Sequence, residues 1–274
     1  MTRWIVFTDL DESLLDSETY SFDPARPALE ELARRGIPVV YVTSKTMAET
    51  VALQRRMEVS APIVVEGGGG IAVPKGLLGV LGDAQDRGAH ELVVLSAPYE
   101  EVLRGLGHLK EFTANSIRGF DDMAVEEVAE LTRLPREAAA LAKQREFDEP
   151  FRFVRRESEF AAHLPRVARE VGLRVSRGAR FFHLHGDTDK GRAVARLKSL
   201  YARALGPLRT VGLGDSEMDL PLLAETDVPV VIPRRDGSFD TVLAMGVPRA
   251  RRAPAPGPRG WNEAMLAVLA DESR

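Results

Sequence analysis

Two aspartates follow the first apolar run of the chain, in the segment IVFTDLDESLLD that begins at Ile5. Asp9 and Asp11 are two residues apart, so an extended backbone would point both carboxylates the same way. Carboxylates that share a site destabilise each other unless a cation lies between them or one stays protonated. Asp215 ends a later apolar run and can supply a third oxygen ligand. Oxygen ligands without cysteine or clustered histidine indicate a hard ion, Mg²⁺ before Zn²⁺.

Lys190 and Thr43 could hold an anion beside these acids. Lys190 starts a predicted helix, where the helix dipole disfavours a cation unless a phosphate is bound there. Thr43 ends a predicted strand and can donate a hydroxyl hydrogen bond. Taken alone, these are better explained as a surface lysine, a strand-end threonine and a solvated Asp-x-Asp turn. Together they indicate phosphoryl transfer, in which a carboxylate attacks phosphorus to form an aspartyl-phosphate while a metal ion, the lysine and the hydroxyl hold the phosphate oxygens.

Alternating strands and helices must position these residues. Apolar runs and helix signals predict strands at 4–8, 37–43 and 61–70, separated by helices at 23–36 and around 47–53. The same pattern returns with a helix from Thr188 or Asp189 to Ala204, strands at 209–215 and 228–233, and helices at 216–225 and 261–270. Residues 251–260 are proline-rich and predict a loop without helix or strand. Such alternation is typical of a parallel sheet covered on both faces.

The middle of the chain has a different pattern. It predicts a strand and helix at 90–106, helices at 125–131 and 135–145, a strand at 149–154, a helix at 159–171 and a hairpin at 173–186 that turns at Arg177-Gly178. We therefore predict an α/β fold with a Rossmann-like, doubly wound parallel core of residues 1–82 and 186–274. An α+β cap of residues 83–185 is inserted between the two core segments.

Composition narrows the class of protein. The chain of 274 residues is 44% hydrophobic, has a net charge of −4 and contains no cysteine. These values predict a folded protein without disulfides or thiolate zinc sites, and they argue against a nucleic-acid partner. We expect no signal peptide, no transmembrane helix and no membrane partner, and hence a cytoplasmic protein. The oligomeric state, monomer or dimer, stays open.

Four segments carry a family resemblance. DLDESLLD, VTSKT, DKGRAV and GLGDSEMDLPLL resemble, in this order, the four motifs of the haloacid dehalogenase superfamily of phosphatases. SLLDSETYSFDPARPALEEL, IVVEGGGG, REFDEPF, RGARFFHL and APGPRGW resemble the mannosyl-3-phosphoglycerate phosphatase family, over nearly the whole chain. The resemblance implies a haloacid dehalogenase-like core with an α/β cap of the C2B type.

The function that the resemblance implies is Mg²⁺-dependent hydrolysis of a small phosphorylated sugar-glycerate, mannosyl-3-phosphoglycerate, to mannosylglycerate, a compatible solute. The alternatives are a phosphatase for glucosyl-3-phosphoglycerate or a hexose phosphate and, less well supported, a phosphomutase. A non-catalytic phosphate-binding relative is the alternative from another class. Retention of Asp9, Asp11, Lys190 and Asp215 argues against it, because a decayed site loses its acids first.

The resemblance also implies residue roles. Asp9 matches the nucleophile, Asp11 the acid/base whose carbonyl ligates Mg²⁺, Lys190 the phosphate lysine, Asp215 the third metal ligand and Asp219 an acid that orients the lysine. Thr43 matches the phosphate-binding hydroxyl, with Ser44 as the alternative. Substrate contacts are expected from Ser13, Ser44, Lys45, Glu66, Gly67, Gly68, Arg177, Gly178 and Arg180. Arg180 or Arg177 suits the glycerate carboxylate, because a guanidinium binds a carboxylate with two hydrogen bonds.

Two positions depart from the family pattern. Glu12-Ser13 stands where the family usually has Gly-Thr, and Gly67 where it often has asparagine. An inward-pointing Glu12 would place a negative charge beside an anion site and weaken substrate binding. An outward-pointing one would be tolerated.

Overall fold

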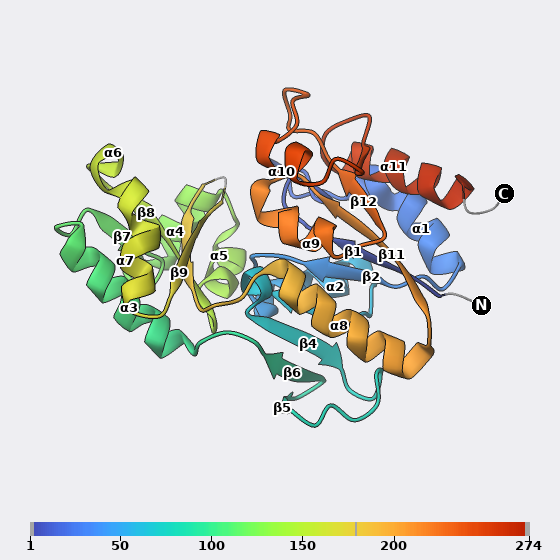
Figure 1. The fold of residues 1–274 in the computed structure, drawn as a ribbon, viewed down its shortest axis with the longest axis horizontal. Coiled ribbons are helices and arrows are strands. Elements are labelled where there is room, and N and C mark those ends of the chain that lie inside the picture. Colours follow the sequence, from blue (N-terminus) through green and yellow to red (C-terminus); the bar gives the residue numbers. More distant parts are fainter. Residues whose placement is uncertain (1–2, 179, 272–274) are drawn as a thin grey trace.

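The computed structural model describes residues 3–178 and 180–271, which form a large sheet covered by helices and a smaller domain beside it (Figure 1). The large sheet has nine strands in the order β13-β12-β11-β1-β2-β3-β4-β6-β5. Their bounds are β1 (Arg3–Thr8), β2 (Val39–Val42), β3 (Ile63–Val65), β4 (Gly70–Pro74), β5 (Ala84–Arg87), β6 (His90–Val94), β11 (Leu208–Gly214), β12 (Val228–Val231) and β13 (Arg251–Arg252). The predicted α/β class with a Rossmann-like core is confirmed.

The direction of the strands brings the motifs together. The six strands from β13 to β3 pair in parallel, whereas β4, β6 and β5 continue the sheet antiparallel. Parallel strands end at one edge of a sheet, which is where ligands bind in open α/β folds. Asp9, Thr43, Glu66 and Asp215 each follow directly after one of these strands, so all four lie at that edge.

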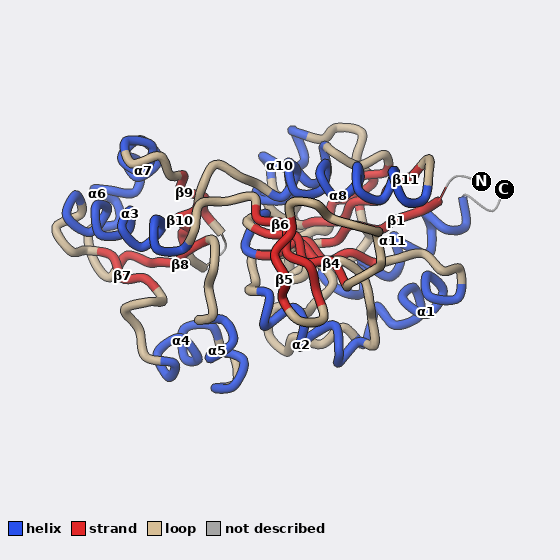
Figure 2. The backbone as a smooth tube through the Cα atoms, turned by 90° about the horizontal axis from the view of Figure 1, so that it is seen from below, coloured by secondary structure: helices blue, strands red, loops and turns tan. Residues whose placement is uncertain are grey.

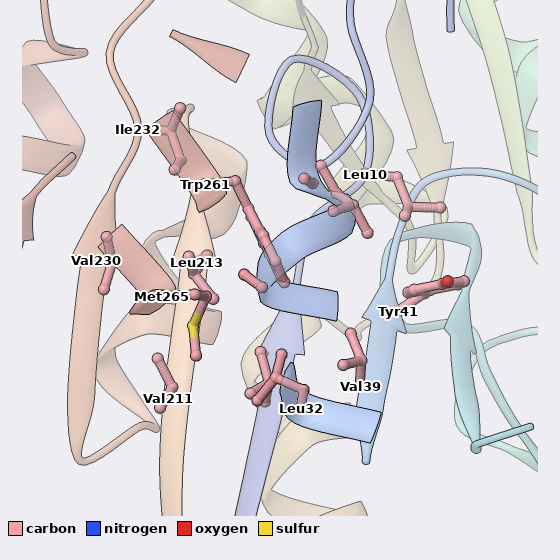
Figure 3. Close-up of a cluster of buried hydrophobic side chains, with 14 of the residues drawn as sticks. Leu10, Leu32, Val39, Tyr41, Val211, Leu213, Val230, Ile232, Trp261 and Met265 are labelled. Carbon is pink, nitrogen blue, oxygen red and sulfur yellow. The ribbon is translucent and has the colours of Figure 1, made fainter. Parts of the chain in front are cut away.

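Successive strand residues point to opposite faces and build two cores. One face packs Val6, Tyr41 and Leu213 against helices α1 (Arg26–Arg34), α2 (Met47–Met57) and α11 (Gly257–Asp271), whose Trp261 is fully buried (Figure 3). The other face packs Ile5 and Phe7 against α8 (Lys190–Leu205), α9 (Leu220–Ala224) and α10 (Thr241–Gly246). Each such buried apolar side chain contributes about 1.5–3 kcal/mol.

Local capping decides where two helices near this edge begin. The Thr46 hydroxyl accepts the backbone N–H of Glu49, whose carboxylate accepts the N–H of Thr46, so α2 starts at Met47. Asp189 accepts the N–H of Arg192, which starts α8 at Lys190. Caps satisfy backbone donors that the first turn leaves free. The ammonium of Lys190 is thereby held in the first turn of α8.

The smaller domain is built on a four-stranded antiparallel sheet, in the order β7-β8-β10-β9. Its elements are α3 (Tyr99–Phe112), β7 (Ile117–Gly119), α4 (Val125–Thr132), α5 (Arg136–Ala142), β8 (Asp148–Phe153), α6 (Glu157–Phe160), α7 (Leu164–Glu170), β9 (Arg174–Arg177) and β10 (Phe182–His185). Helices α3 and α7 share a core with the sheet, whereas α4 and α5 pack in a separate cluster on its other side (Figure 2).

Three sequence expectations need correction. The insertion was expected from residue 83, but β5 and β6 pair within the large sheet, so the separate domain begins near Ser96. An antiparallel extension of a parallel sheet has the same residue pattern as the strands of an inserted domain. The predicted loop 251–260 contributes β13 and the first turn of α11, and the predicted helix 159–171 is divided into α6 and α7. From here on, "cap" means residues 96–185. No helix in the described ranges is long and apolar enough to cross a membrane.

Candidate active site

A buried lysine joins two aspartates at the carboxyl edge of the sheet. Lys190 Nζ lies 2.6 Å from Asp9 Oδ1 and 2.6 Å from Asp219 Oδ1. Carboxylate oxygens of Asp9, Asp215 and Asp219 all lie within 4.8 Å of one another. The exposed fractions are 7% for Asp9, 8% for Asp215 and 0% for Asp219. The structure thus brings together four residues from three separate segments of the chain.

A chain of hydrogen bonds from helix α11 fixes the position of Asp9. The indole Nε1 of Trp261 donates to Thr8 Oγ1 at 2.9 Å, and Thr8 Oγ1 donates to the carbonyl of Asp9 at 2.7 Å. The N–H of Asp9 donates to the carbonyl of Leu213 on the neighbouring strand β11. Helix α11 therefore supports Asp9 through Trp261, a contact that the sequence did not indicate.

The other two acids are oriented by short polar contacts. Ser13 Oγ donates to Asp215 Oδ1 at 3.0 Å. Asp219 Oδ2 accepts the backbone N–H groups of Asp215 and Ser216, while its other oxygen meets Lys190. A substrate contact was expected from Ser13, but Ser13 is fully buried and its hydroxyl positions the Asp215 carboxylate.

The charges of this cluster do not balance. Three buried carboxylates face one buried ammonium, which leaves an excess of two negative charges. Burial, followed by the charges of Asp219 and Asp11, raises the pKa of Asp9 to about 7 even though Lys190 lowers it. Burial also raises the pKa of Asp215, and Asp219 and Asp9 add to the effect. Burial alone would lower the pKa of Lys190, but Asp219 and Asp9 outweigh it and raise that pKa. A divalent cation held by oxygen ligands would neutralise the excess, so these residues fit Mg²⁺.

Asp11 faces the site from a different direction than expected. Strand β1 ends at Thr8 and the chain turns, so the side chains of Asp9 and Asp11 do not share one extended face. Asp11 Oδ2 pairs with Lys45 Nζ at 2.9 Å, and its side chain is 40% exposed. The acidic cluster is formed by the carboxylates of Asp9, Asp215 and Asp219, and the Asp11 carboxylate is not part of it.

Lys45 connects Asp11 to the wall of the site. Its ammonium lies 5.2 Å from the centre of the Tyr20 ring, a distance suited to a cation–π contact. Burial would lower the pKa of Lys45, but the charges of Asp11 and Glu49 raise it overall. Lys45 therefore stays positively charged, and its contacts with Asp11 and Tyr20 fix its position.

A cavity opens above these residues, between the sheet edge and the cap. Its core wall includes Asp9, Asp11, Glu12, Ser17, Tyr20, Ser44, Lys45, Glu49, Lys190, Asp215, Ser216 and Met218. Its cap wall is formed by Phe120, Thr132, Leu134, Ala142, Arg145, Pro150, Gly178, Arg180, Phe181 and His183. Ser44 is on this wall, whereas Thr43 is fully buried and its hydroxyl accepts the N–H of Lys45 at 3.1 Å. Of the two hydroxyls considered, the structure brings Ser44 to the cavity.

The glycine-rich turn after β3 does not reach the cavity, although the sequence predicted substrate contacts there. Glu66 is 1% exposed and its carboxylate accepts the backbone N–H groups of residues 146, 147 and 148, at 2.8–3.1 Å. Neither Gly67 nor Gly68 lines the cavity. A Cβ on Gly68 would lie 2.2 Å from the carbonyl oxygen of Asp189, and one on Gly69 would lie 2.3 Å from Phe147 Cβ. The turn is thus packed between the cap and the start of α8, and the glycines permit that approach.

The two candidate arginines of the β9–β10 hairpin differ. Arg177 is exposed, pairs with Glu157 at 2.6 Å and does not line the cavity. Arg180 lines it, but its guanidinium donates to the carbonyls of Thr132 at 2.7 Å and Ser17 at 3.1 Å. Arg180 therefore joins the cap to a core loop, and the expected role of Arg177 against the substrate is not supported. Gly178 lines the cavity as predicted.

Glu12 lies at the rim, with φ of 62°. This left-handed conformation is strained for residues other than glycine, which explains why glycine suits the position. Glu12 borders the main cavity and also a neighbouring one that Arg235 lines.

Three buried residues of the cap add to the site, and two of them, Arg145 and Asp148, lie in REFDEPF, which by resemblance was expected to face the active site. Arg145 pairs with Asp148, and Asp148 Oδ2 lies 2.8 Å from His183 Nδ1. Arg145 and His183 line the cavity. His183 was not predicted, because nothing in the sequence links REFDEPF to a histidine on another strand.

Comparisons with known proteins show which family the chain resembles. No protein-family model matches the chain. A glucosyl-3-phosphoglycerate/mannosyl-3-phosphoglycerate phosphatase of Persephonella marina is 38% identical over 273 residues, 98% of each chain. One of Methanococcoides burtonii is 36% identical over 97% of each chain. A mannosyl-3-phosphoglycerate phosphatase of Pyrococcus furiosus is 32% identical over 83% of this chain and 90% of its own.

Solved structures show the same fold at lower identity. A sugar phosphatase of subclass IIB of the haloacid dehalogenase superfamily superposes with a TM-score of 0.67 at 16% identity, over 98% of this chain and 99% of its own. A haloacid dehalogenase-like hydrolase from B. subtilis gives a TM-score of 0.65 at 16% identity, over 97% of this chain and 98% of its own. The chain belongs to the glucosyl-3-phosphoglycerate/mannosyl-3-phosphoglycerate phosphatase family of phosphoric monoester hydrolases, and it has a haloacid dehalogenase-like fold.

Proposed function

We propose that this chain is a Mg²⁺-dependent phosphatase that hydrolyses mannosyl-3-phosphoglycerate and its glucosyl counterpart through an aspartyl-phosphate. The contact of Lys190 with both Asp9 and Asp219, next to Asp215, is the observation that carries the proposal. Both sugars are included because the relatives at 38% and 36% identity are named for both.

The first step transfers the phosphoryl group to Asp9. An Asp9 carboxylate oxygen attacks phosphorus as the bond to the glycerate C3 oxygen breaks. Asp11 gives its proton to that leaving oxygen, which departs as the alcohol. Lys190 balances charge on the phosphoryl oxygens. Mg²⁺, when held by Asp9 and Asp215, would neutralise phosphate charge and so lower the barrier to attack by an anion.

The second step returns the enzyme to its starting state. Asp11, now a carboxylate, accepts a proton from water as the water oxygen attacks phosphorus. The bond between phosphorus and the Asp9 oxygen breaks, so inorganic phosphate leaves and both acids are restored. The pairing of Asp11 with Lys45 holds its carboxylate at the cavity wall, which suits the base in this second step.

Residues 96–185 form the substrate-selecting part in this proposal. Ten cavity residues come from this segment, so the sugar and the glycerate would be enclosed between cap and core. The division into a core and a cap is part of the proposal, as is the assignment of Ser44 as the phosphate-binding hydroxyl.

A phosphate-release assay tests the function. It compares mannosyl- and glucosyl-3-phosphoglycerate with mannose and glucose 6-phosphates, with Mg²⁺ and after chelation. We expect kcat/KM for the two glycosyl-phosphoglycerates to exceed that for the hexose phosphates by about a hundredfold, and chelation to abolish all turnover. Equal rates on hexose phosphates would contradict the substrate assignment, and turnover that survives chelation would contradict the metal.

A further inference from the structure

His183 on β10 is a buried imidazole that the proposed mechanism does not use. It is 8% exposed and lines the cavity across from the catalytic acids. Nδ1 lies 2.8 Å from Asp148 Oδ2, and the other side of Asp148 pairs with Arg145. A carboxylate only accepts hydrogen bonds, so this contact assigns the proton of a neutral imidazole to Nδ1. Nε2 is then a free acceptor.

The Nε2 side of the ring faces Gly178, which lines the cavity together with His183. A Cβ on Gly178 would lie 3.2 Å from His183 Nε2. Within the described part of the chain, no hydrogen-bond donor to Nε2 is recorded. The imidazole also stays uncharged, because burial, followed by the charges of Arg145, His185 and Lys190, lowers the pKa of His183 to about 3.

The support behind the imidazole reaches the core. Arg145 Nε lies 3.6 Å from Glu66 Oε2, and Arg145 Nη2 donates to the carbonyl of Ser44 at 3.0 Å. All four residues, from Glu66 through Arg145 and Asp148 to His183, are buried, with exposed fractions of 8% or less. Such a chain fixes both the tautomer and the direction of the ring.

We infer that His183 is a specificity-determining residue whose Nε2 accepts a hydrogen bond from a hydroxyl of the substrate's sugar. The inference rests on the proposed function. In a glycosyl-3-phosphoglycerate, the glycerate hydroxyls carry the phosphate and the sugar, and the phosphate and carboxylate groups are acceptors. Only sugar hydroxyls remain as donors. An acceptor at this wall also repels the glycerate carboxylate, so it sets the orientation of the substrate.

Kinetics of His183→Phe test the inference, with p-nitrophenyl phosphate as a substrate that has no sugar. We expect KM for glycosyl-3-phosphoglycerate to rise about tenfold, because a sugar hydroxyl then faces an apolar ring. The kinetics with p-nitrophenyl phosphate should not change. His185→Phe is the matched control, since His185 lies on the same strand but lines a different cavity. His185→Phe should leave the kinetics with both substrates unchanged. Equal effects of His183→Phe on both substrates, or none on either, would overturn the inference.

A second measurement keeps the test valid if His183→Phe does not fold. In the ¹⁵N-histidine-labelled wild-type protein, the Nε2 resonance of His183 should shift when the dephosphorylated product, glycosylglycerate, is added. A Nε2 resonance that stays constant at saturating product would overturn the inference. A wild-type enzyme that hydrolyses p-nitrophenyl phosphate but no glycosyl-3-phosphoglycerate would instead refute the proposed substrate, and this inference with it.

Discussion

At the scale of residues, the site is a charge imbalance held in place by packing. Asp9, Asp215 and Asp219 share one ammonium, that of Lys190, in a place with little water. Unpaired buried charge is costly, so the arrangement is stable only with a proton or a cation present. The same excess of negative charge favours the binding of a divalent metal ion. Its chemistry therefore follows from burial as much as from the identity of the acids.

The titration of Asp9 should appear in the stability of the metal-free protein. The pKa of Asp9 is raised to about 7 in the folded chain and is about 4 when unfolded. The stabilising proton is fully bound below about pH 4 and is lost as the pH rises through about 7, so the metal-free protein should lose stability over this range. Melting temperatures with chelator should show this loss, and Mg²⁺ should offset it.

Asp9→Asn separates this effect from other titrating groups. The variant cannot gain or lose the proton, so its melting temperature should fall less between pH 4 and pH 7. Identical pH profiles for the two proteins would show that Asp9 does not titrate in this range.

Glu12 offers a second test at this scale. Its side chain brings negative charge to the cavity rim, and its φ of 62° is strained. Glu12→Gln removes only the charge and should lower KM for a phosphorylated substrate about two- to fivefold. Glu12→Gly removes the strain too, and should stabilise the fold by about 1 kcal/mol relative to Glu12→Gln. A higher KM in Glu12→Gln would show that Glu12 supports substrate binding.

At the scale of elements, the ends of the parallel strands explain which residues of the site can be predicted from the sequence. Asp9, Lys190 and Asp215 follow from apolar runs that stop at a polar residue and from a helix start, because parallel strands end at one edge. The partners of Glu66 could not be predicted this way. Its contacts lie 80–82 residues further along the chain, and they depend on how the cap packs against the core.

Glu66→Gln tests the role of the turn after β3. The amide has one acceptor oxygen where the carboxylate has two, and no charge, so the N–H groups of residues 146–148 should be held less tightly. We expect their hydrogen exchange to quicken about tenfold and KM for glycosyl-3-phosphoglycerate to rise. Glu91→Gln, on β6 of the same sheet, is the control. Unchanged exchange at 146–148 in Glu66→Gln would contradict the proposed role of Glu66 in holding the cap.

At the scale of the whole molecule, the cap lies closed on the core. The two connections run side by side, where the N–H of Gly186 donates to Ser96 Oγ at 3.1 Å (Figure 1). Across the cavity, the Tyr20 hydroxyl and Arg180 both donate to the carbonyl of Thr132. Contacts at the two connections and beside the cavity therefore hold the cap against the core, which favours exclusion of water during phosphoryl transfer.

Arg180→Ala should loosen this closure. It removes the bonds to Thr132 and Ser17, so we expect KM for glycosyl-3-phosphoglycerate to rise about tenfold and that for p-nitrophenyl phosphate to change less. Arg177→Ala is the matched control, because Arg177 is exposed on the same hairpin and does not line the cavity. If Arg177→Ala has the same effect, the hairpin acts through its overall charge and not through the Arg180 contacts.

The most direct measurement is phosphate release from mannosyl-3-phosphoglycerate by Asp9→Asn at saturating Mg²⁺. Asparagine keeps the shape of the side chain but is a poor nucleophile, so turnover should fall by at least about a thousandfold. The fold should persist, with a melting temperature no lower than that of the metal-free wild type, because one of three repelling charges is gone. Turnover within tenfold of the wild type would contradict the account.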